Sequence, residues 1–444
     1  MSMRVASRQR VRAWLVQRRA LAMLAGTALS VVVYLPDELL HHLGPQLAHL
    51  SGGGMVTGGL ALALLAIVAL MTYRQITAVY PQSGDAYSIT RDTLGRLPRL
   101  LAGGGLLTSN VLAVAISISA SVAVLTTLWP VLAPYRVVLA IGIILLSCLL
   151  HMHGRRVPTL AYILAGILFT GVLLLTLAAA LKHVHEVSGL PTIPHLPPIA
   201  FLLLMGVGVG CTMIVSANSL PNGRVARLRR TTLLLIAILG LVLMLLGGTT
   251  WLAAYGGLVH QGEPILSQLA RSVYGATLGW YLVQGGTLVI LLVAAQTPFA
   301  GVTHVIVMLA RDGELPGQYA ARHDRRSHAD GAVIFALFAA GLVLYVHASV
   351  THLLPWYIVS ACITFLLAQA GMASRCAHLK LRGWRRNLFL HGIAVVAAGI
   401  TFALISSMTV ATVTWVVSCL LAILIGLAFG IHRLTILARQ SHRT

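Results

Sequence analysis

The stretch "LAGTALSVVVYLPDELL", residues 24–40, is an apolar run that glycine, hydroxyl and proline residues interrupt. The interrupting residues are Gly26, Thr27, Ser30 and Pro36. A later run, "MGVGVGCTMIVSANSLPNG" at residues 205–223, is interrupted in the same way. Its interrupting residues are Gly206, Gly208, Gly210, Cys211, Thr212, Ser216 and Asn218. Because glycine destabilises a helix by about 1 kcal/mol relative to alanine, both runs are predicted to be helices that unwind part-way along.

The whole chain is too apolar for a soluble globule. Of its 444 residues, 58% are hydrophobic and only 9% are charged, and the mean hydropathy is +0.89. Most of twelve apolar runs reach the roughly 20 residues that cross about 30 Å of hydrocarbon as a helix. The runs begin near Leu21, Gly54, Leu97, Val137, Thr159, Ile199, Thr232, Leu278, Ala332, Leu354, Leu388 and Thr412. We therefore predict an all-α polytopic membrane protein with about 12 transmembrane helices.

The net charge of +21 is distributed as a topology signal. All 31 Lys and Arg residues except Arg136, Lys182 and Arg271 lie in the two termini and in every second loop. This positive-inside pattern predicts a multi-pass protein of the cell membrane with both termini in the cytoplasm. The expected partners are the lipid bilayer and a small-molecule or monovalent cation substrate. Nucleic acid is not expected, and a homodimer is a candidate assembly.

The first five spans and the next five correspond in position. The third span of each half is unusually long, about 32 residues in Leu97–Leu128 and in Leu278–Leu309, which implies a strong tilt. An odd number of spans per half inverts the second half relative to the first. We therefore predict a 5+5 inverted repeat followed by two further helices, with the binding site at mid-membrane between the broken helices. The predicted boundaries are 1–19 for a basic cytoplasmic N-terminus, 20–198 and 199–378 for the two five-helix repeats, 379–432 for two additional transmembrane helices and 433–444 for a short cytoplasmic tail.

Each long span carries a polar cluster. Thr108, Ser109 and Asn110 lie in the first span, and Gln296 and Thr297 lie in the second. We expect both clusters to face a polar cavity at the middle of the membrane. An alternative stays open for each residue, because glycines also permit close helix packing and Ser or Thr hydroxyls also bond to carbonyls of their own helix.

None of the ten acidic residues lies at the centre of a span. Asp37 and Glu38 come nearest, at the outer end of the first helix, where they are either solvated or line an entrance. A buried carboxylate commonly holds a cation or relays a proton in the membrane, so its absence weakens a simple proton-coupled mechanism. His304, the one basic titratable group identified near a span interior, is interpreted as an ordinary hydrogen-bonded residue. A site of neutral oxygens and helix dipoles suits a zwitterion or a weakly bound monovalent ion.

The chain offers no recognisable catalytic or metal-binding motif. Its five cysteines lie singly, without CxxC spacing, so neither a disulfide framework nor a zinc site is expected. These cysteines are Cys148, Cys211, Cys362, Cys376 and Cys419. The intramembrane polar residues supply no pair of a nucleophile and a base. We expect no cofactor, no metal and no enzymatic activity.

Three stretches carry a family pattern: "YPQSGDAY" at residues 80–87, "GCTMIVSANSLPNG" at residues 210–223 and "ARDGELP" at residues 310–316. In order and spacing they resemble the amino acid, polyamine and organocation (APC) superfamily, and within it the KimA-like potassium importers. The resemblance extends from about Leu21 to His432. It implies the LeuT-like fold of secondary transporters, in which a helix bundle rocks around a midplane site.

The departures from that family fall on its chemistry. The resemblance implies that potassium-importing relatives carry acids where this chain has Thr27, Ser109 and Asn218, so the strongest potassium ligands are missing. A family threonine is also replaced by Ala113. The residues that still match polar family positions are Tyr34, Ser117, Thr212 and Tyr357. The family's C-terminal cytoplasmic nucleotide-binding domain is absent from the sequence, so regulation by cyclic di-AMP is not expected.

The leading prediction is a secondary transporter that moves a small solute, preferably an amino acid or a related organic solute, by alternating access. Two alternatives stay open: KimA-like potassium uptake through an altered site, and a transport-inactive membrane sensor or assembly subunit. The predicted substrate-binding residues are Gly26, Thr27, Ser30, Tyr34, Ser109, Ser117, Thr212, Ser216, Asn218 and Tyr357. The coupling-ion candidates are Gln296 and Thr297.

Overall fold

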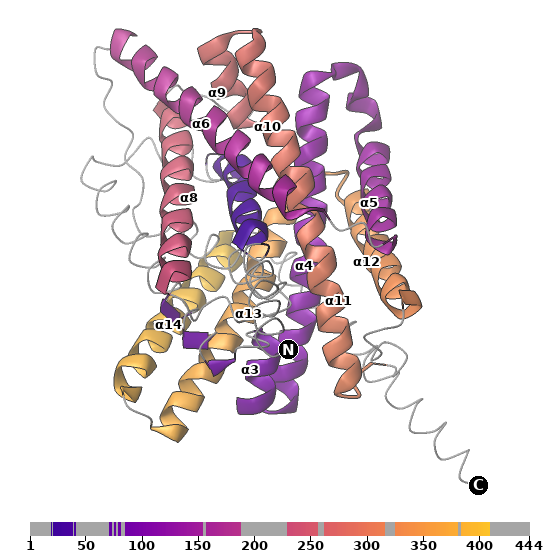
Figure 1. Ribbon diagram of the computed structural model, residues 1–444, viewed down its shortest axis with the longest axis vertical. Helices are drawn as coiled ribbons and strands as arrows, with labels where there is room; N and C mark the ends of the chain where they lie inside the picture. Colours follow the sequence, from indigo (N-terminus) through magenta and orange to yellow (C-terminus); the bar gives the residue numbers. More distant parts are fainter. Residues whose placement is uncertain are drawn as a thin grey trace, which may run out of the picture. The chain divides into compact units, whose positions relative to one another are not determined.

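The computed structural model (Figure 1) describes most of the helical chain. The described residues are 21–38, 85–153, 157–187, 229–255, 262–315, 325–380 and 383–408, with 19, 40, 71–72, 75–76 and 79–80. All regular secondary structure in these residues is helical, which confirms the predicted all-α class. The predicted spans that begin near Gly54, Ile199 and Thr412 lie outside the described residues, so the number of 12 helices stays a prediction.

The helices follow one another along the chain in a simple order. An unlabelled helix, Leu21–Glu38, comes first. The labelled helices are α3 (Ala86–Thr93), α4 (Arg96–Leu128), the 3-10 helix η1 (Pro130–Tyr135), α5 (Arg136–Met152), α6 (Thr159–Val187), α8 (Arg229–Tyr255), α9 (Ile265–Tyr274), α10 (Leu278–Ala294), α11 (Gln296–Arg311), α12 (Arg325–Tyr345), α13 (Val350–Leu379) and α14 (Trp384–Met408).

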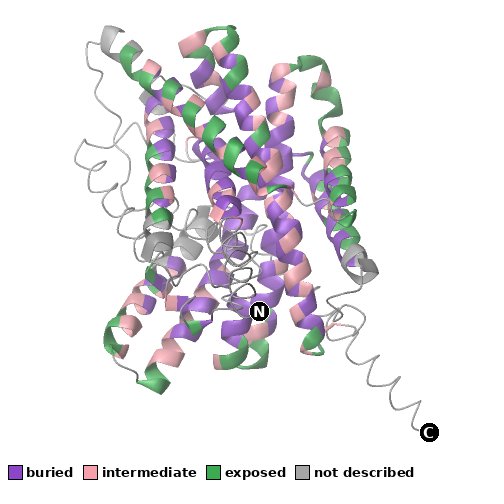
Figure 2. Ribbon diagram, viewed as in Figure 1, coloured by how far each residue is buried: buried purple, intermediate pink, exposed green. Residues whose placement is uncertain are grey.

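Six helical segments in the described residues are long and apolar enough to cross a membrane. They are Leu21–Glu38, Arg96–Leu128, Pro130–Met152, Thr159–Lys182, Leu278–Arg311 and Val350–Leu379. Two shorter apolar helices, Ala237–Ala253 and Gly331–Tyr345, accompany them. Figure 2 shows exposed residues along α5 and α6, and these include large apolar side chains such as Leu145, Leu164 and Ile167. Such faces fit a lipid solvent, because hydrocarbon covers them without help from other helices.

The chain forms two compact units, and the first comprises residues 1–84, 120–136 and 157–294. Within it α10 packs against α6, and α9 contacts α6, α8 and α10. The Leu21–Glu38 helix lies close to α6, because a Cβ at Gly26 would lie 3.3 Å from Tyr162 Cδ1. One turn later, the side chain of Leu29 would lie 3.4 Å from a Cβ at Gly166. Glycine therefore serves close packing in this helix pair.

The second unit comprises residues 85–119, 137–156 and 295–444. Within it α13 packs against α3 and α14, and α11 packs against α12. Ser360 Oγ in α13 donates to the carbonyl oxygen of Gly105 in α4 at 2.9 Å. Phe299 of α11 meets Phe335 of α12 edge to face, with ring centroids 4.9 Å apart. Both units draw on both halves of the sequence, so the predicted repeat boundaries stay a prediction.

The two long spans differ from each other. The first is one helix, α4, of 33 residues. The second is divided, because α10 ends at Ala294 and α11 begins at Gln296. The division lies four residues before Pro298, which has no N–H to donate to the carbonyl of Ala294. The long apolar span expected over Leu278–Leu309 is present as Leu278–Arg311, with this division inside it.

Candidate functional site

The first predicted site element is a continuous helix. Residues 21–38 are helical throughout, so the predicted unwinding at Gly26 and Thr27 is wrong for this run. The hydroxyl of Thr27 lies 3.0 Å from the carbonyl oxygen of Met23, and that of Ser30 donates to the carbonyl oxygen of Thr27 at 2.8 Å. These hydroxyls therefore donate to carbonyl oxygens of their own helix and do not interrupt it. This was the alternative left open for single Ser and Thr residues.

The structure brings three of the predicted substrate-binding residues together on this helix. Thr27, Ser30 and Tyr34 are spaced three and four residues apart, and such residues lie on one helix face. The hydroxyls of Ser30 and Tyr34 are hydrogen-bonded to each other. Thr27 is half-buried, whereas Ser30 and Tyr34 are buried. The face therefore presents uncharged oxygen atoms, and Gly26 beside it is occupied by the contact with α6.

The outer end of the same helix is tied to α9. Asp37 Oδ1 accepts a hydrogen bond from the backbone N–H of Ile265, the first residue of α9, at 2.5 Å. Pro264 at the N-cap position offers no side-chain bond of its own. Asp37 thus supplies the cap that this helix start requires.

The polar triplet of α4 is fully enclosed. Ser109 and Asn110 both donate to the carbonyl oxygen of Leu106, at 3.1 Å and 2.7 Å. The hydroxyl oxygen of Thr108 and the amide oxygen of Asn110 are buried and have no hydrogen-bond partner among the described residues. Leaving a buried polar atom unpaired costs about 1–3 kcal/mol. These two atoms are therefore available to a bound molecule, while Ser109 is already engaged.

The start of α11 holds the coupling-ion candidates. Gln296 Nε2 donates to Ser147 Oγ in α5 at 2.9 Å, so the predicted residue gains a partner that sequence reasoning missed. The hydroxyl oxygen of Thr297 is buried without a partner in the described part of the chain. It lies next to the division between α10 and α11, where backbone groups also lose their helical bonds.

The remaining predicted residues divide into two groups. Ser117 in α4 and Tyr357 in α13 are buried, 6% and 4% exposed. Thr212, Ser216 and Asn218 lie outside the described residues. Their part in a site stays a prediction.

A buried histidine was missed by the sequence analysis, which took His304 as the one basic group near a span interior. His391 in α14 is fully buried, and its Nδ1 lies 2.6 Å from Gln369 Oε1 in α13. Because an amide oxygen only accepts, Nδ1 carries the hydrogen of this bond. The signal in the sequence was a single histidine within the apolar stretch that begins at Leu388.

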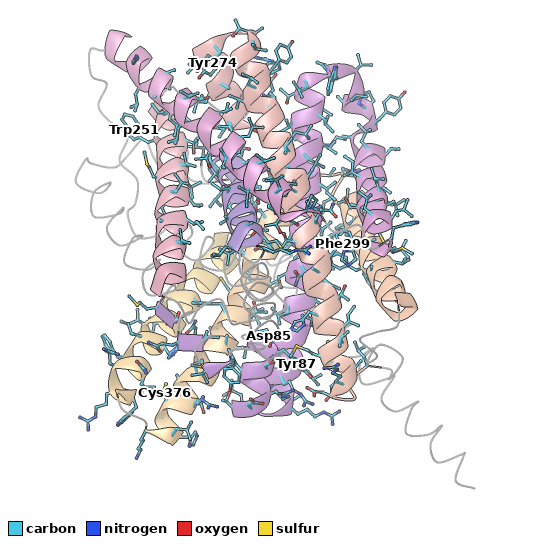
Figure 3. All side chains as sticks on the ribbon, in the orientation of Figure 1. Asp85, Tyr87, Trp251, Tyr274, Phe299 and Cys376 are labelled. Atoms are coloured by element: carbon cyan, nitrogen blue, oxygen red, sulfur yellow. The ribbon has the colours of Figure 1, made fainter. Side chains whose placement is uncertain are left out.

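Described residues of two of the family motifs, "YPQSGDAY" and "ARDGELP", lie in contact with each other. Tyr87 donates to Asp312 Oδ2 at 2.7 Å, and Arg91 Nη1 lies 3.4 Å from both carboxylate oxygens of Asp312. Burial and then the hydrogen bond to Asp312 raise the pKa of Tyr87, so its hydroxyl stays protonated and remains the donor. Figure 3 shows Tyr87 beside Asp85 in this region.

A second acid of the loop after α11 is paired with α4. Glu314 is 3% exposed, and it forms ion pairs with Arg99 and, at 3.3 Å, with Arg96. A buried carboxylate needs such charged partners, so these pairs fix the loop to the start of α4. No group of three His, Cys, Asp or Glu side chains that could hold a metal occurs among the described residues.

Asp85 lies at the start of α3 and has two different roles for its two oxygens. Oδ1 accepts a hydrogen bond from the backbone N–H of Ser88 at 2.7 Å and so caps the helix. Oδ2 lies 3.6 Å from His304 Nε2 in α11. The sequence analysis interpreted His304 as an ordinary hydrogen-bonded residue. The structure places Asp85, which lies far away in the sequence, as its polar neighbour.

The comparisons with known proteins agree with this architecture. A model of the amino acid permease family matches residues 17–429. The potassium transporter KimA of Bacillus subtilis (strain 168) is 31% identical over 436 residues, which cover 94% of this chain and 70% of that protein.

Two solved structures resemble the fold. MhsT in complex with L-phenylalanine superposes with a TM-score of 0.56 at 12% identity, over 87% of this chain and 98% of that chain. A Na+-coupled sialic acid symporter in a substrate-bound outward-open state gives a TM-score of 0.51 at 14% identity, over 88% of this chain and 90% of that chain. The predicted LeuT-like fold is therefore confirmed.

The matched family and these relatives are membrane transporters and not enzymes, as the sequence predicted. The family model spans nearly the whole chain and so covers residues of both compact units. The chain therefore belongs to the amino acid permease family, within the APC superfamily of multi-pass membrane transporters.

Proposed function

We propose that this transporter moves an amino acid or a related organic solute by alternating access. The proposed substrate-binding residues of the described chain are Gly26, Thr27, Ser30, Tyr34, Ser109, Ser117 and Tyr357. Thr212, Ser216 and Asn218 are proposed to complete the site. Gln296 and Thr297 are the candidates for a coupling-ion site.

The observation that carries this proposal is the absence of charge along the described polar segments. From Leu21 to Pro36, and in α4 beyond Arg99, no carboxylate and no cationic side chain occurs in the residues that the structure describes. The polar groups that do occur are hydroxyls and one amide. A neutral site favours a solute that brings compensating charges of its own, as a zwitterion does, because a bare cation would leave its charge unpaired in a low dielectric.

The unpaired atoms of α4 and α11 support the same proposal. The oxygens of Thr108, Asn110 and Thr297 are buried without partners among the described residues. An ammonium group or an amide hydrogen of a solute satisfies such acceptors, and the bond then contributes about 1 kcal/mol or more to binding.

Potassium uptake is the second candidate, because KimA is a potassium transporter and is 31% identical to this chain. Carbonyl and hydroxyl oxygens hold monovalent cations in other transporters. Selective binding would then depend on oxygens of the residues 205–223 as well as on Thr27, without the acids that the family pattern implies for potassium importers.

Uptake into proteoliposomes separates the two candidates. The purified protein is tested with a panel of labelled amino acids and with rubidium as a tracer for potassium. Thr27→Val replaces the hydroxyl by a methyl group of similar volume and is expected to raise the KM of the transported solute about fivefold, the equivalent of one hydrogen bond. Thr277→Val, at an exposed position before α10, is the matched control and should leave the KM unchanged.

The outcome that would overturn the proposal is rubidium uptake that Asn218→Ala abolishes, with no flux of any amino acid. Thermal unfolding in the presence of the same solutes tests the third alternative, a transport-inactive sensor. A solute that binds raises the Tm by mass action. Binding without flux would indicate a sensor or an assembly subunit.

We also propose that both termini lie in the cytoplasm, because the arginine-rich loops alternate with loops that carry almost no cations. Single cysteines introduced as Ser2→Cys and Ser441→Cys into a cysteine-free protein should stay unlabelled when an impermeant maleimide is added to intact cells. Labelling of either from outside would reverse the topology. Chemical cross-linking of the same membranes tests the proposed homodimer.

A further inference from the structure

We propose that Asp85 and His304 form a proton-binding pair on the arginine-rich side of the protein, and that protonation of this pair slows transport. The proposal requires a transporter but does not depend on which solute is moved. It concerns residues outside the polar segments of the proposed substrate site.

The carboxylate of Asp85 is buried and only half satisfied. The residue is 1% exposed. Its Oδ1 is used by the cap of α3, whereas Oδ2 is buried and accepts no hydrogen bond among the described residues. A buried carboxylate oxygen without a charged partner is unfavourable, so a cationic neighbour would stabilise Oδ2.

His304 is the group that meets this need. Its Nε2 lies 3.6 Å from Asp85 Oδ2, and its side chain is 15% exposed. The residue lies about 10 Å from the end of α11, at a rise of about 1.5 Å per residue. Histidine is the side chain that changes its charge between about pH 5 and pH 8. Only the protonated imidazole forms an ion pair with Asp85, so acid strengthens this contact.

The neighbouring charged groups are already paired with one another. On α3, on α4 and in the loop after α11 these groups are Tyr87, Arg91, Asp92, Arg96, Arg99, Asp312 and Glu314. Arg311 lies at the exposed end of α11, about two turns beyond His304. From α13, which packs on α3, the charged residue Arg375 has an interaction of its own. From α5, His151 lies against Phe299 of α11. From α12, the described side chains of Gly331–Tyr345 carry no acid or base other than Tyr345. Among the residues that the structure describes, His304 is therefore the group left to compensate Asp85.

The pair of Asp85 and His304 adds to a contact that already holds α3 close to the end of α11. Tyr87 holds α3 to Asp312 just after α11, and the pair of Asp85 and His304 links the start of α3 to α11 itself. An ion pair that forms at acidic pH adds to the free energy needed to separate α3 from α11. A transport cycle in which α3 separates from α11 is slowed by this added free energy.

The test uses two variants that remove charge but keep local geometry. Asp85→Asn keeps an oxygen that caps α3, since asparagine is as good an N-cap residue as aspartate. His304→Gln keeps a hydrogen-bonding side chain that does not titrate. Uptake is measured in proteoliposomes with the same pH on both sides, so that no proton gradient drives the solute. The wild type is expected to be about fivefold slower at about pH 5.5 than at about pH 7.5, and both variants should lose this dependence.

His378→Gln, at the exposed end of α13, is the matched control and should keep the profile of the wild type. An identical pH profile for the wild type and both charge variants would overturn the proposal.

A measurement without transport separates this failure from a failure to find the solute. The Tm of the purified protein is followed from about pH 5.5 to about pH 8. The advantage of the wild type over His304→Gln should be largest at acidic pH and shrink as the pH rises, because the ion pair is lost when the imidazole deprotonates. A difference that is independent of pH would contradict the proton-binding pair even in a protein whose solute is unidentified.

Discussion

A methyl group added at Gly105 tests the contact between α4 and α13 directly. The Cβ of Gly105→Ala would lie 2.5 Å from Thr364 Cγ2, well inside van der Waals contact. Thr364 is fully buried, and its hydroxyl bonds to the carbonyl oxygens of Ser360 and Ala361, so its side chain cannot rotate away without losing these bonds. The same close contact between α4 and α13 includes the hydrogen bond that Ser360 Oγ donates to the Gly105 carbonyl oxygen at 2.9 Å. A shift of α13 away from α4 would therefore also strain that bond.

The expected magnitude follows from these opposing effects. Overpacking of a well-packed core costs about 1–3 kcal/mol, and the strained hydrogen bond adds about 1 kcal/mol. Alanine in place of glycine in a helix returns about 1 kcal/mol. The net loss of stability is about 2 kcal/mol, which lowers the Tm of a chain of this length by roughly 2 °C.

Thermal unfolding of the purified protein measures this effect, and a second substitution isolates its cause. Thr364→Ser removes the one methyl group that clashes and keeps the hydroxyl, so Gly105→Ala combined with Thr364→Ser should recover most of the lost stability. Gly341→Ala is the control, because nothing lies within 4 Å of a Cβ at that position. The reasoning is refuted if Gly105→Ala is neutral, or if the double variant is no more stable than Gly105→Ala alone.

Three further predictions concern single polar contacts. Asp37→Ala removes the acceptor of the first α9 N–H and should lower stability by about 1 kcal/mol, whereas Asp37→Asn should retain most of it, as measured by Tm. Ser147→Ala leaves the Gln296 amide without its acceptor and should cost about 1–2 kcal/mol, and the added change Gln296→Leu should recover part of that loss in a double-mutant cycle. Tyr87→Phe should cost about 1–2 kcal/mol through the lost bond to Asp312. Because burial raises the pKa of Tyr87, this difference should stay constant from about pH 6 to about pH 10 and fall only when the tyrosine ionises.

The fold class and the family could be predicted from the sequence because both depend on patterns along the chain. Apolar runs of about 20 residues specify spanning helices, since lipid leaves the backbone no other partner than itself. The "YPQSGDAY" and "ARDGELP" motifs are short, and each carries at least one acidic residue. Residues of both motifs, Tyr87 and Asp312, do meet in the structure.

The contacts that define the polar sites could not be predicted in this way. Gln296 bonds to Ser147 across 149 residues, and Asp37 bonds to the N–H of Ile265 across 228 residues. Such pairs depend on which faces two helices turn to each other, and hydropathy does not encode that choice.

The position of the helix break tests which residues interrupt a helix inside a membrane protein. The low helix propensity of glycine predicted a break at Gly26, yet that helix is continuous, and the observed division falls four residues before Pro298. Propensity scales measure competition with water, which hydrates an unwound backbone. Away from water an unwound segment must find other partners for every N–H and C=O group, so glycine alone gives no reason to unwind. Proline removes a donor in any solvent, yet Pro36 and Pro355 lie inside helices that continue past them. Neither residue type alone therefore decides where a helix divides, and the division between α10 and α11 lies beside Gln296 and Thr297.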